Sequence, residues 1–193
     1  GMIYGASLSW SPDDKESYDI VDKKISMLEF GEKSGKLVSL LRELCRQDKI
    51  IWNNIAFWRD YKVYNKPMFD SVIKEFTEVS ETDLVESVNR ALEISKQILA
   101  LSNDVPENHK PDMQEFYLSA RGVALMQALS LIIKKYDFKQ DIKTLAYSPW
   151  DLAEMLEYWL YDFIGLWRKR NKESELYRIR EALMQICDIL RNY

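Results

Sequence analysis

The stretch that decides the fold is Ser148–Leu190, which reads SPWDLAEMLEYWLYDFIGLWRKRNKESELYRIREALMQICDIL. Ser148 suits an N-cap, Pro149 suits the first helical position, and Asp151 places an acidic side chain in the first turn, as the helix dipole favours. Apolar residues then follow at helical spacing: Leu152, Leu156, Trp159, Phe163 and Trp167. About twenty helical residues span roughly 30 Å, the width of a small domain. We therefore expect this to be the central, buried helix of the fold.

A second helix is expected to pack against the first. Its apolar positions are Leu176, Ile179, Leu183, Ile186 and Leu190. The turn between the two helices follows Arg168, Lys169 and Arg170, and cations at a helix C-terminus complement the helix dipole. The stretch as a whole therefore predicts a helical hairpin.

Apolar periodicity predicts the remaining helices over residues 13–30, 34–58, 67–76, 82–99 and 111–136, so that there are about seven in all. A kink is expected near Gln47 and Asp48, and Gly31 is expected to end the first helix. Gly122 costs its helix about 1 kcal/mol relative to alanine, which predicts a close helix contact at that position. The polar loop over residues 102–111 is a candidate subdomain boundary.

Met2–Trp10 is the one strand-like segment, and it ends at a helix start. A single strand needs a partner for its backbone groups, so this segment is either an ordered arm packed on helices or a piece of a sheet absent from the chain. We predict an extended arm over residues 1–11 and a helical domain over residues 12–193. The predicted fold class is all-α: a single bundle-like domain with a short extended N-terminal arm.

Composition narrows the function classes. The net charge of −4 argues against a nucleic-acid partner. We find no apolar run of the length that a membrane span needs and no signal peptide, so no membrane partner is expected. Cys45 and Cys187 both lie on apolar helix faces and match no metal or redox spacing, which predicts two buried free thiols.

No catalytic residue, metal site or cofactor is predicted. His109 is the one histidine, and it stands in a polar loop without an evident orienting partner, so we interpret it as a solvated loop residue. Paired acids such as Glu154 with Glu157 are more typical of helix dipole and solubility effects than of general acid–base catalysis.

One helix face is a candidate binding surface. Asp151, Glu154, Tyr158 and Tyr161 advance by three, four and three residues, so they share one stripe of their helix, away from its main apolar stripe. Such an acidic-aromatic stripe can line a sugar site or pack against another domain. The competing interpretation is a partly exposed helix face without a ligand.

Several motifs resemble a known family. Gly5–Trp10 is similar to the last strand of a catalytic barrel, in which a Trp lines the sugar pocket. Phe30-Gly31 and Leu37–Leu44 resemble the first helices beyond that barrel, and Phe116–Leu131 resembles a later one. The run Trp167–Asn171, followed by Glu175-Leu176, resembles the signature that closes such regions. The chain thus resembles the C-terminal helical region of β-N-acetylhexosaminidase-like glycoside hydrolases (family twenty and related barrels).

This resemblance implies a non-catalytic helical region that packs on a catalytic barrel absent from the chain. The family's catalytic Asp-Glu pair belongs to an earlier strand, and no matching segment is present. The resemblance adds Trp10 to Asp151, Glu154, Tyr158 and Tyr161 as candidate ligand-binding residues. However, the acid that often follows the family's Trp by two positions is replaced by Pro12.

The expected partners are the catalytic barrel domain or another protein, with carbohydrate as a further candidate. The compartment depends on this choice: cytoplasmic if the chain is complete, exported if it is part of a secreted glycosidase. The main alternative is an independent all-α interaction module of inhibitor or immunity type, which predicts a solvent-facing aromatic-acidic surface. A stand-alone enzyme would need a pocket where Asp151, Glu154 and a Tyr converge.

Overall fold

The chain is all-helical over residues 18–193, which are the residues that the computed structural model describes. The predicted arm over residues 1–11, with Trp10, lies outside this range. Within it, no strand forms, and there are eight α-helices and two short 3₁₀ helices. These elements are α2 (Tyr18–Glu29), α3 (Leu37–Leu44), α4 (Trp52–Tyr64), α5 (Asp70–Glu78), α6 (Glu81–Leu101), η1 (Glu107–His109), α7 (Lys110–Tyr136), α8 (Pro149–Arg170), η2 (Glu173–Glu175) and α9 (Leu176–Arg191).

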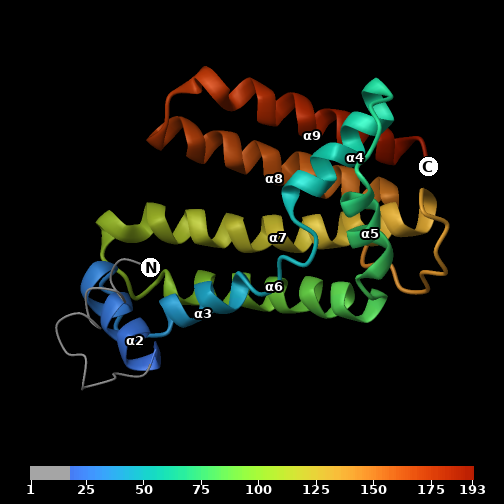
Figure 1. Cartoon of the computed structure of the whole chain (residues 1–193). Helices are drawn as coiled ribbons and strands as arrows, with labels where there is room; N and C mark the ends of the chain where they lie inside the picture. The colour runs from blue at the N-terminus through green and yellow to red at the C-terminus, as the bar shows by residue number, and fades with distance from the viewer. Residues whose placement is uncertain (1–17) are drawn as a thin grey trace.

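Four long helices give the molecule its framework. Figure 1 shows α6, α7, α8 and α9 running side by side, each in the opposite direction to the one before it. The short helices cover this framework: α4 packs on α9, α5 packs on α7, and α2 packs on α3, which in turn packs on α6 and α7. The loop over residues 102–111 thus joins two helices that pack along each other, and the subdomain boundary proposed there stays a prediction.

Over the described residues 18–193 there is one α-helix more than predicted, because residues 34–58 form two helices rather than one kinked helix. The connection between α3 and α4 is held by Gln127, a fully buried residue of α7. Its side chain accepts a hydrogen bond from the backbone N–H of Ile50 (3.1 Å) and donates to the carbonyl of Ile50 and to Asp48 (both 3.2 Å). These long-range hydrogen bonds hold the loop against α7, and they cannot be predicted from the helical spacing of nearby residues.

The central helix is α7, and the prediction that placed α8 at the centre is wrong. Fourteen of the 27 residues of α7 are buried, against five of the 22 residues of α8. The reason lies in Gly122–Ile133, where only Gln127 and Ser130 interrupt an otherwise apolar or small sequence. A helix that is apolar around its whole circumference must be enclosed on all sides.

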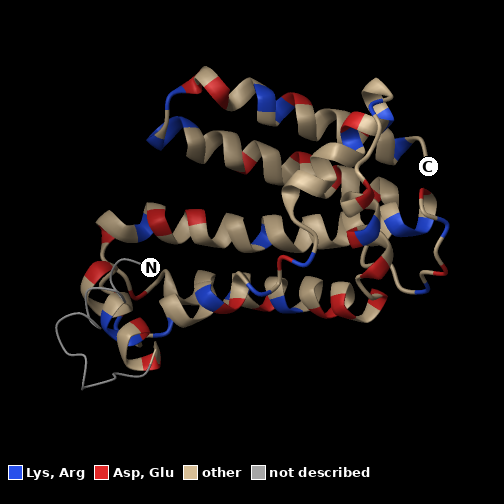
Figure 2. Ribbon diagram, viewed as in Figure 1, with Lys and Arg blue, Asp and Glu red and all other residues tan. Residues whose placement is uncertain are grey.

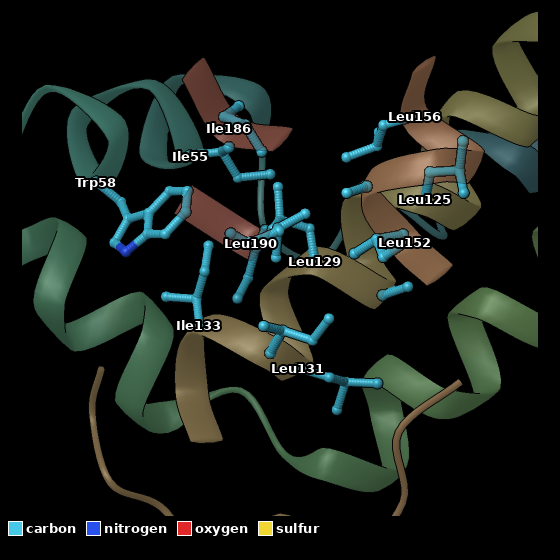
Figure 3. Close-up of a cluster of buried hydrophobic side chains, with 14 of the residues drawn as sticks. Ile55, Trp58, Leu125, Leu129, Leu131, Ile133, Leu152, Leu156, Ile186 and Leu190 are labelled. Atoms are coloured by element: carbon cyan, nitrogen blue, oxygen red, sulfur yellow. The ribbon is translucent and has the colours of Figure 1, made fainter. Parts of the chain in front are cut away.

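The main core forms where α4, α7, α8 and α9 meet. Figure 3 shows ten of its members gathered around α7: Ile55, Trp58, Leu125, Leu129, Leu131, Ile133, Leu152, Leu156, Ile186 and Leu190. A second core cluster joins α3, α6 and the first half of α7, with Leu37, Leu40, Ile94, Ile98 and Met113 among its members. Of the predicted apolar positions of α9, Leu183, Ile186 and Leu190 are buried in the main core, and Ile179 packs against it partly buried. Leu176 is buried as well, but it belongs to neither cluster.

Helix ends follow the capping chemistry in the sequence. The Ser148 side chain accepts a hydrogen bond from the backbone N–H of Asp151 (3.1 Å), so the predicted start of α8 is confirmed. Gly31 follows the end of α2 with a φ of +64°, a conformation that glycine adopts without strain. The start of α6 lies slightly earlier than the predicted Thr82, because Ser80 is the N-cap and accepts from the backbone N–H of Asp83 (3.0 Å).

Among residues 18–193, one helix meets the length and composition of a membrane span, which differs from the expectation that no apolar stretch of this length is present. It comprises η1 and α7, and 67% of its most apolar window is buried by the rest of the structure. Burial of this kind is also expected for the central helix of a helical bundle.

Candidate functional site

The predicted acidic-aromatic stripe lies on the exposed side of α8. Tyr158 and Tyr161 are 60% and 79% exposed, and Asp151 and Glu154 are exposed as well. Tyr158 donates a hydrogen bond to Glu154 (3.4 Å), whereas the carboxylate of Asp151 accepts from the hydroxyl of its own N-cap, Ser148 (2.7 Å). The structure therefore pairs two of the four residues and gives Asp151 a capping role. The ligand-binding role of the stripe stays a prediction.

The opposite side of α8 carries an aromatic row, which we define as Trp159, Phe163 and Trp167. The first two rings are stacked with their centroids 5.1 Å apart, and the third lies 5.5 Å from the second. The sequence suggested that these residues are core, because they repeat every four positions. In the structure they are only partly buried.

A hydrogen bond and a glycine fix the position of Trp159. Its indole N–H donates to the backbone carbonyl of Leu118 on α7 (2.8 Å). A β-carbon built on Gly122 would lie 3.0 Å from Cζ2 of the same indole, which is tighter than ordinary contacts. The predicted close helix contact at Gly122 is confirmed, and Trp159 is the group that makes it.

A pocket of about 210 Å³ opens between α7 and α8 beside the aromatic row. The row, with Leu118 and Leu166, forms its apolar part. Glu115, Ser119 and Asn171 supply polar groups. We call this cavity the α7–α8 pocket. Its residues come from two separate segments of the chain, 115–119 and 159–171, so it cannot be recognised from a local sequence motif.

An ionic network lies beside Glu115 of the pocket. Arg170, at the end of α8, binds Asp112 through one guanidinium nitrogen (2.7 Å) and Glu115 through another (3.2 Å). Asp112 also contacts Nδ1 of His109 (3.1 Å). The interpretation of His109 as a solvated loop residue without a partner is therefore wrong, because the turn of η1 into α7 places Asp112 three residues further on, within reach of its ring.

The network keeps Asp112 ionised. Burial by itself would raise the pKa of Asp112, but the hydrogen bonds from Arg170 and His109 outweigh it and lower the pKa. The hydrogen bond with Asp112 in turn raises the pKa of Arg170. The result is an ion pair that ties the end of α8 to the start of α7.

A second candidate surface covers the outer side of α4. We define the α4 surface as the large apolar side chains that are 38% to 60% exposed there, namely Ile51, Trp52, Phe57, Tyr61, Val63, Tyr64 and Phe69. The rings of Phe57 and Phe69 meet edge to face with centroids 5.1 Å apart. Between α4 and α9 runs a groove of about 360 Å³, lined by Trp52, Arg59 and Arg178 among others.

The cysteines differ from the prediction in one case. Cys187 is buried as expected, but Cys45 is exposed. The reason is that α3 ends at Leu44, so Cys45 falls outside the helix whose apolar face would have buried it. Among residues 18–193, no group of three or more His, Cys, Asp or Glu side chains is placed to hold a metal ion.

Comparison with known proteins returned no relative. No protein-family model, no curated protein and no solved structure matches the chain. The case for a function therefore rests on the α4 surface, the α7–α8 pocket and the exposed stripe of α8.

Proposed function

We propose that the chain is a non-catalytic helical module that packs on another protein domain, in first place as the C-terminal helical region of a glycoside hydrolase whose catalytic barrel is absent from this chain. The family assignment rests on the resemblance of Gly5–Trp10 and Trp167–Asn171 to motifs of such enzymes. The packing role rests on a single observation, the α4 surface.

A helix at the surface of a globular domain normally turns charged residues outward. In contrast, α4 buries Ile55 and Trp58 on one side and exposes Phe57, Tyr61 and Tyr64 on the other. Each aromatic side chain can bury about 150–250 Å². Five of the seven residues of the α4 surface are aromatic and are 39% to 60% exposed, and such a group of exposed aromatic side chains is typical of a contact surface.

The first experiment determines the reading frame upstream of Met2. We expect it to encode a barrel, and we expect the longer protein, but not the 193-residue chain, to hydrolyse an aryl N-acetyl-β-hexosaminide. Hydrolysis by the 193 residues alone would contradict the non-catalytic assignment. An upstream frame without a barrel would contradict the glycoside hydrolase assignment.

The second experiment tests the surface itself. Phe57→Ser with Tyr61→Ser should weaken the association between the helical chain and the separately produced barrel, measured by calorimetry. Leu99→Ser is the control, since Leu99 is an apolar residue on α6 that is 53% exposed, against 40% for Phe57 and 43% for Tyr61. Equal binding by both variants would exclude the α4 surface as the contact.

The alternative function is an independent interaction module of inhibitor or immunity type. The exposure of Tyr158 and Tyr161 favours this alternative, because an independent interaction module is expected to have a solvent-facing aromatic-acidic surface. If the frame begins at Met2, the partner to test is the product of the neighbouring gene. Tyr158→Ala with Tyr161→Ala should then weaken that complex by about tenfold or more, and unchanged binding would exclude the stripe.

A further inference from the structure

We propose that the α7–α8 pocket is a binding site for a neutral pyranose ring. The proposal goes beyond the packing role of the α4 surface and uses none of its residues. A sugar site between α7 and α8 would let the module hold one unit of a glycan by itself, whether or not a barrel is attached.

The apolar side of the pocket is preorganised. The indole N–H of Trp159 is held by the carbonyl of Leu118 (2.8 Å), and that of Trp167 is held by the carbonyl of Lys172 (2.9 Å). Phe163 is clamped between the two indoles. Because the rings are already fixed, a ligand that packs against them loses little affinity to side-chain ordering.

The size of the pocket limits its ligand. Sites for drug-sized molecules have volumes of about 300–1,000 Å³, whereas this cavity measures about 210 Å³. One six-membered ring with its substituents suits that space. A longer glycan would place one unit inside and leave the rest in solvent.

The polar groups suit hydroxyls. Ser119 and Asn171 can each donate and accept hydrogen bonds, and the carboxylate of Glu115 accepts them. Arg170 contacts Oε1 of Glu115, which orients the carboxylate. A pyranose combines an apolar ring face with hydroxyls that both donate and accept, and it therefore matches both parts of the pocket.

The charges disfavour other small ligands. A fatty acid or a phosphate would approach two carboxylates, Asp112 and Glu115, and an arginine that already binds both. An amine would approach Glu115 but also Arg170. An alkyl chain would leave the polar groups of the pocket unpaired, which costs binding free energy. A neutral polyhydroxylated ring meets none of these penalties.

The test uses the 193-residue chain and its indole N–H signals in NMR spectra, with Trp159 and Trp167 assigned from Trp→Phe variants. Methyl β-glucopyranoside, methyl β-galactopyranoside and methyl N-acetyl-β-glucosaminide are titrated separately. We expect at least one to shift both signals to saturation with a Kd of roughly 1 mM. The signals of Trp52 and Trp150, which lie outside the pocket, should not move.

Two variants locate the ligand. Glu115→Gln should weaken binding about tenfold, because it replaces a charged acceptor. Asp112→Asn is the matched control: it disturbs the same arginine without lining the pocket, and it should change the Kd by less than about twofold. Ser119→Phe, at an exposed position, should fill the cavity and abolish binding.

The absence of saturation at about ten times 1 mM for all three glycosides would overturn the proposal. So would displacement of the sugar by octanoate, or wild-type affinity in Glu115→Gln. Circular dichroism verifies that each variant is folded, and Glu115→Gln decides the matter if Ser119→Phe does not fold. Loss of barrel binding leaves these outcomes unaffected, so the two proposals fail independently.

Discussion

At the scale of single residues, two helical glycines form a natural pair. A β-carbon on Gly122 would press against the indole of Trp159 at 3.0 Å, whereas a β-carbon on Gly165 would meet nothing within 4 Å. Both lie inside helices, where alanine is intrinsically favoured over glycine by about 1 kcal/mol. The space around the added methyl group therefore decides the outcome at each site.

We expect Gly165→Ala to stabilise the protein by about 0.5–1 kcal/mol and Gly122→Ala to destabilise it by about 1 kcal/mol. Urea unfolding followed by circular dichroism measures both free energies of unfolding. Stabilisation by Gly122→Ala would mean that the indole can move aside, and that the contact with Trp159 is looser than described.

The two thiols also differ at this scale. Burial, assisted by the nearby Glu157, raises the pKa of Cys187 to about 12, while Cys45 lies exposed. Because the thiolate is the reactive form, a thiol reagent should modify Cys45 and leave Cys187 intact in the folded protein. Mass spectrometry should find one label in buffer and two in denaturant. A label on Cys187 of the folded chain would contradict its burial.

At the scale of elements, Asp137 joins three segments that are far apart in sequence. Its carboxylate accepts hydrogen bonds from the indole of Trp58 on α4 (2.7 Å) and from the hydroxyl of Tyr193 beyond α9. It also binds Lys62 (2.7 Å). The ring of Tyr193 stacks on that of Tyr136 with centroids 4.8 Å apart. Through these contacts, Asp137 fixes α4 and the chain segment after α9 to the end of α7.

We expect Asp137→Ala to destabilise the protein by about 2–4 kcal/mol, because it leaves a buried indole N–H without its acceptor and removes a charged partner. Thermal and urea unfolding measure the loss. Asp141→Ala, an exposed acid in the same loop, is the control and should change the free energy of unfolding by less than about 0.5 kcal/mol. Equal effects at both positions would refute the role of Asp137.

Element prediction from this sequence succeeded where the signal is local. Ser148 caps α8 and Gly31 follows α2 as expected, because capping depends on a few neighbouring residues. Which of the long helices is most deeply buried was not predictable in the same way. The apolar positions of α8 and the apolar run of α7 both indicate a buried helix. How deeply each helix is buried depends on which other helices pack around it.

The candidate site shows the same limit. The spacing of Asp151, Glu154, Tyr158 and Tyr161 was enough to place them on one exposed face of α8. The α7–α8 pocket was missed, although the aromatic row repeats every four residues and was visible in the sequence. Its distinguishing partners, Glu115 and Ser119, lie some forty residues earlier and join it only through tertiary packing.

At the scale of the whole molecule, acidic side chains hold several helix ends together. Figure 2 shows acidic and basic residues interspersed along the helices. Burial alone would raise the pKa of Glu32, but hydrogen bonds from Ser34, Lys36 and Leu37 outweigh it and lower the pKa. The pKa of Asp112 is lowered as well, by Arg170 and His109 acting against burial.

In the folded protein, the pKa of Glu32 lies below its ordinary value of 4.5 and that of Asp112 lies below its ordinary value of 3.8. Both carboxylates therefore contribute their full stabilisation at pH values above these ordinary values. We expect the stability to fall as the pH drops below about 4.5 and through the lower folded values. Urea unfolding as a function of pH measures the slope, which should be shallower for Asp112→Asn. A stability that does not change between pH 5 and about pH 3 would contradict this account.

The order in which α6, α7, α8 and α9 stack has a kinetic consequence. Each of these helices packs on the next one along the chain, so the framework needs only short loops to close. Chains rich in such local contacts cross their rate-limiting barrier quickly. The exception is α4, which must wait for α9, more than a hundred residues later, before its inner face is covered. During synthesis, α4 would therefore leave the ribosome long before α9 can cover it, with its aromatic side chains accessible to chaperones.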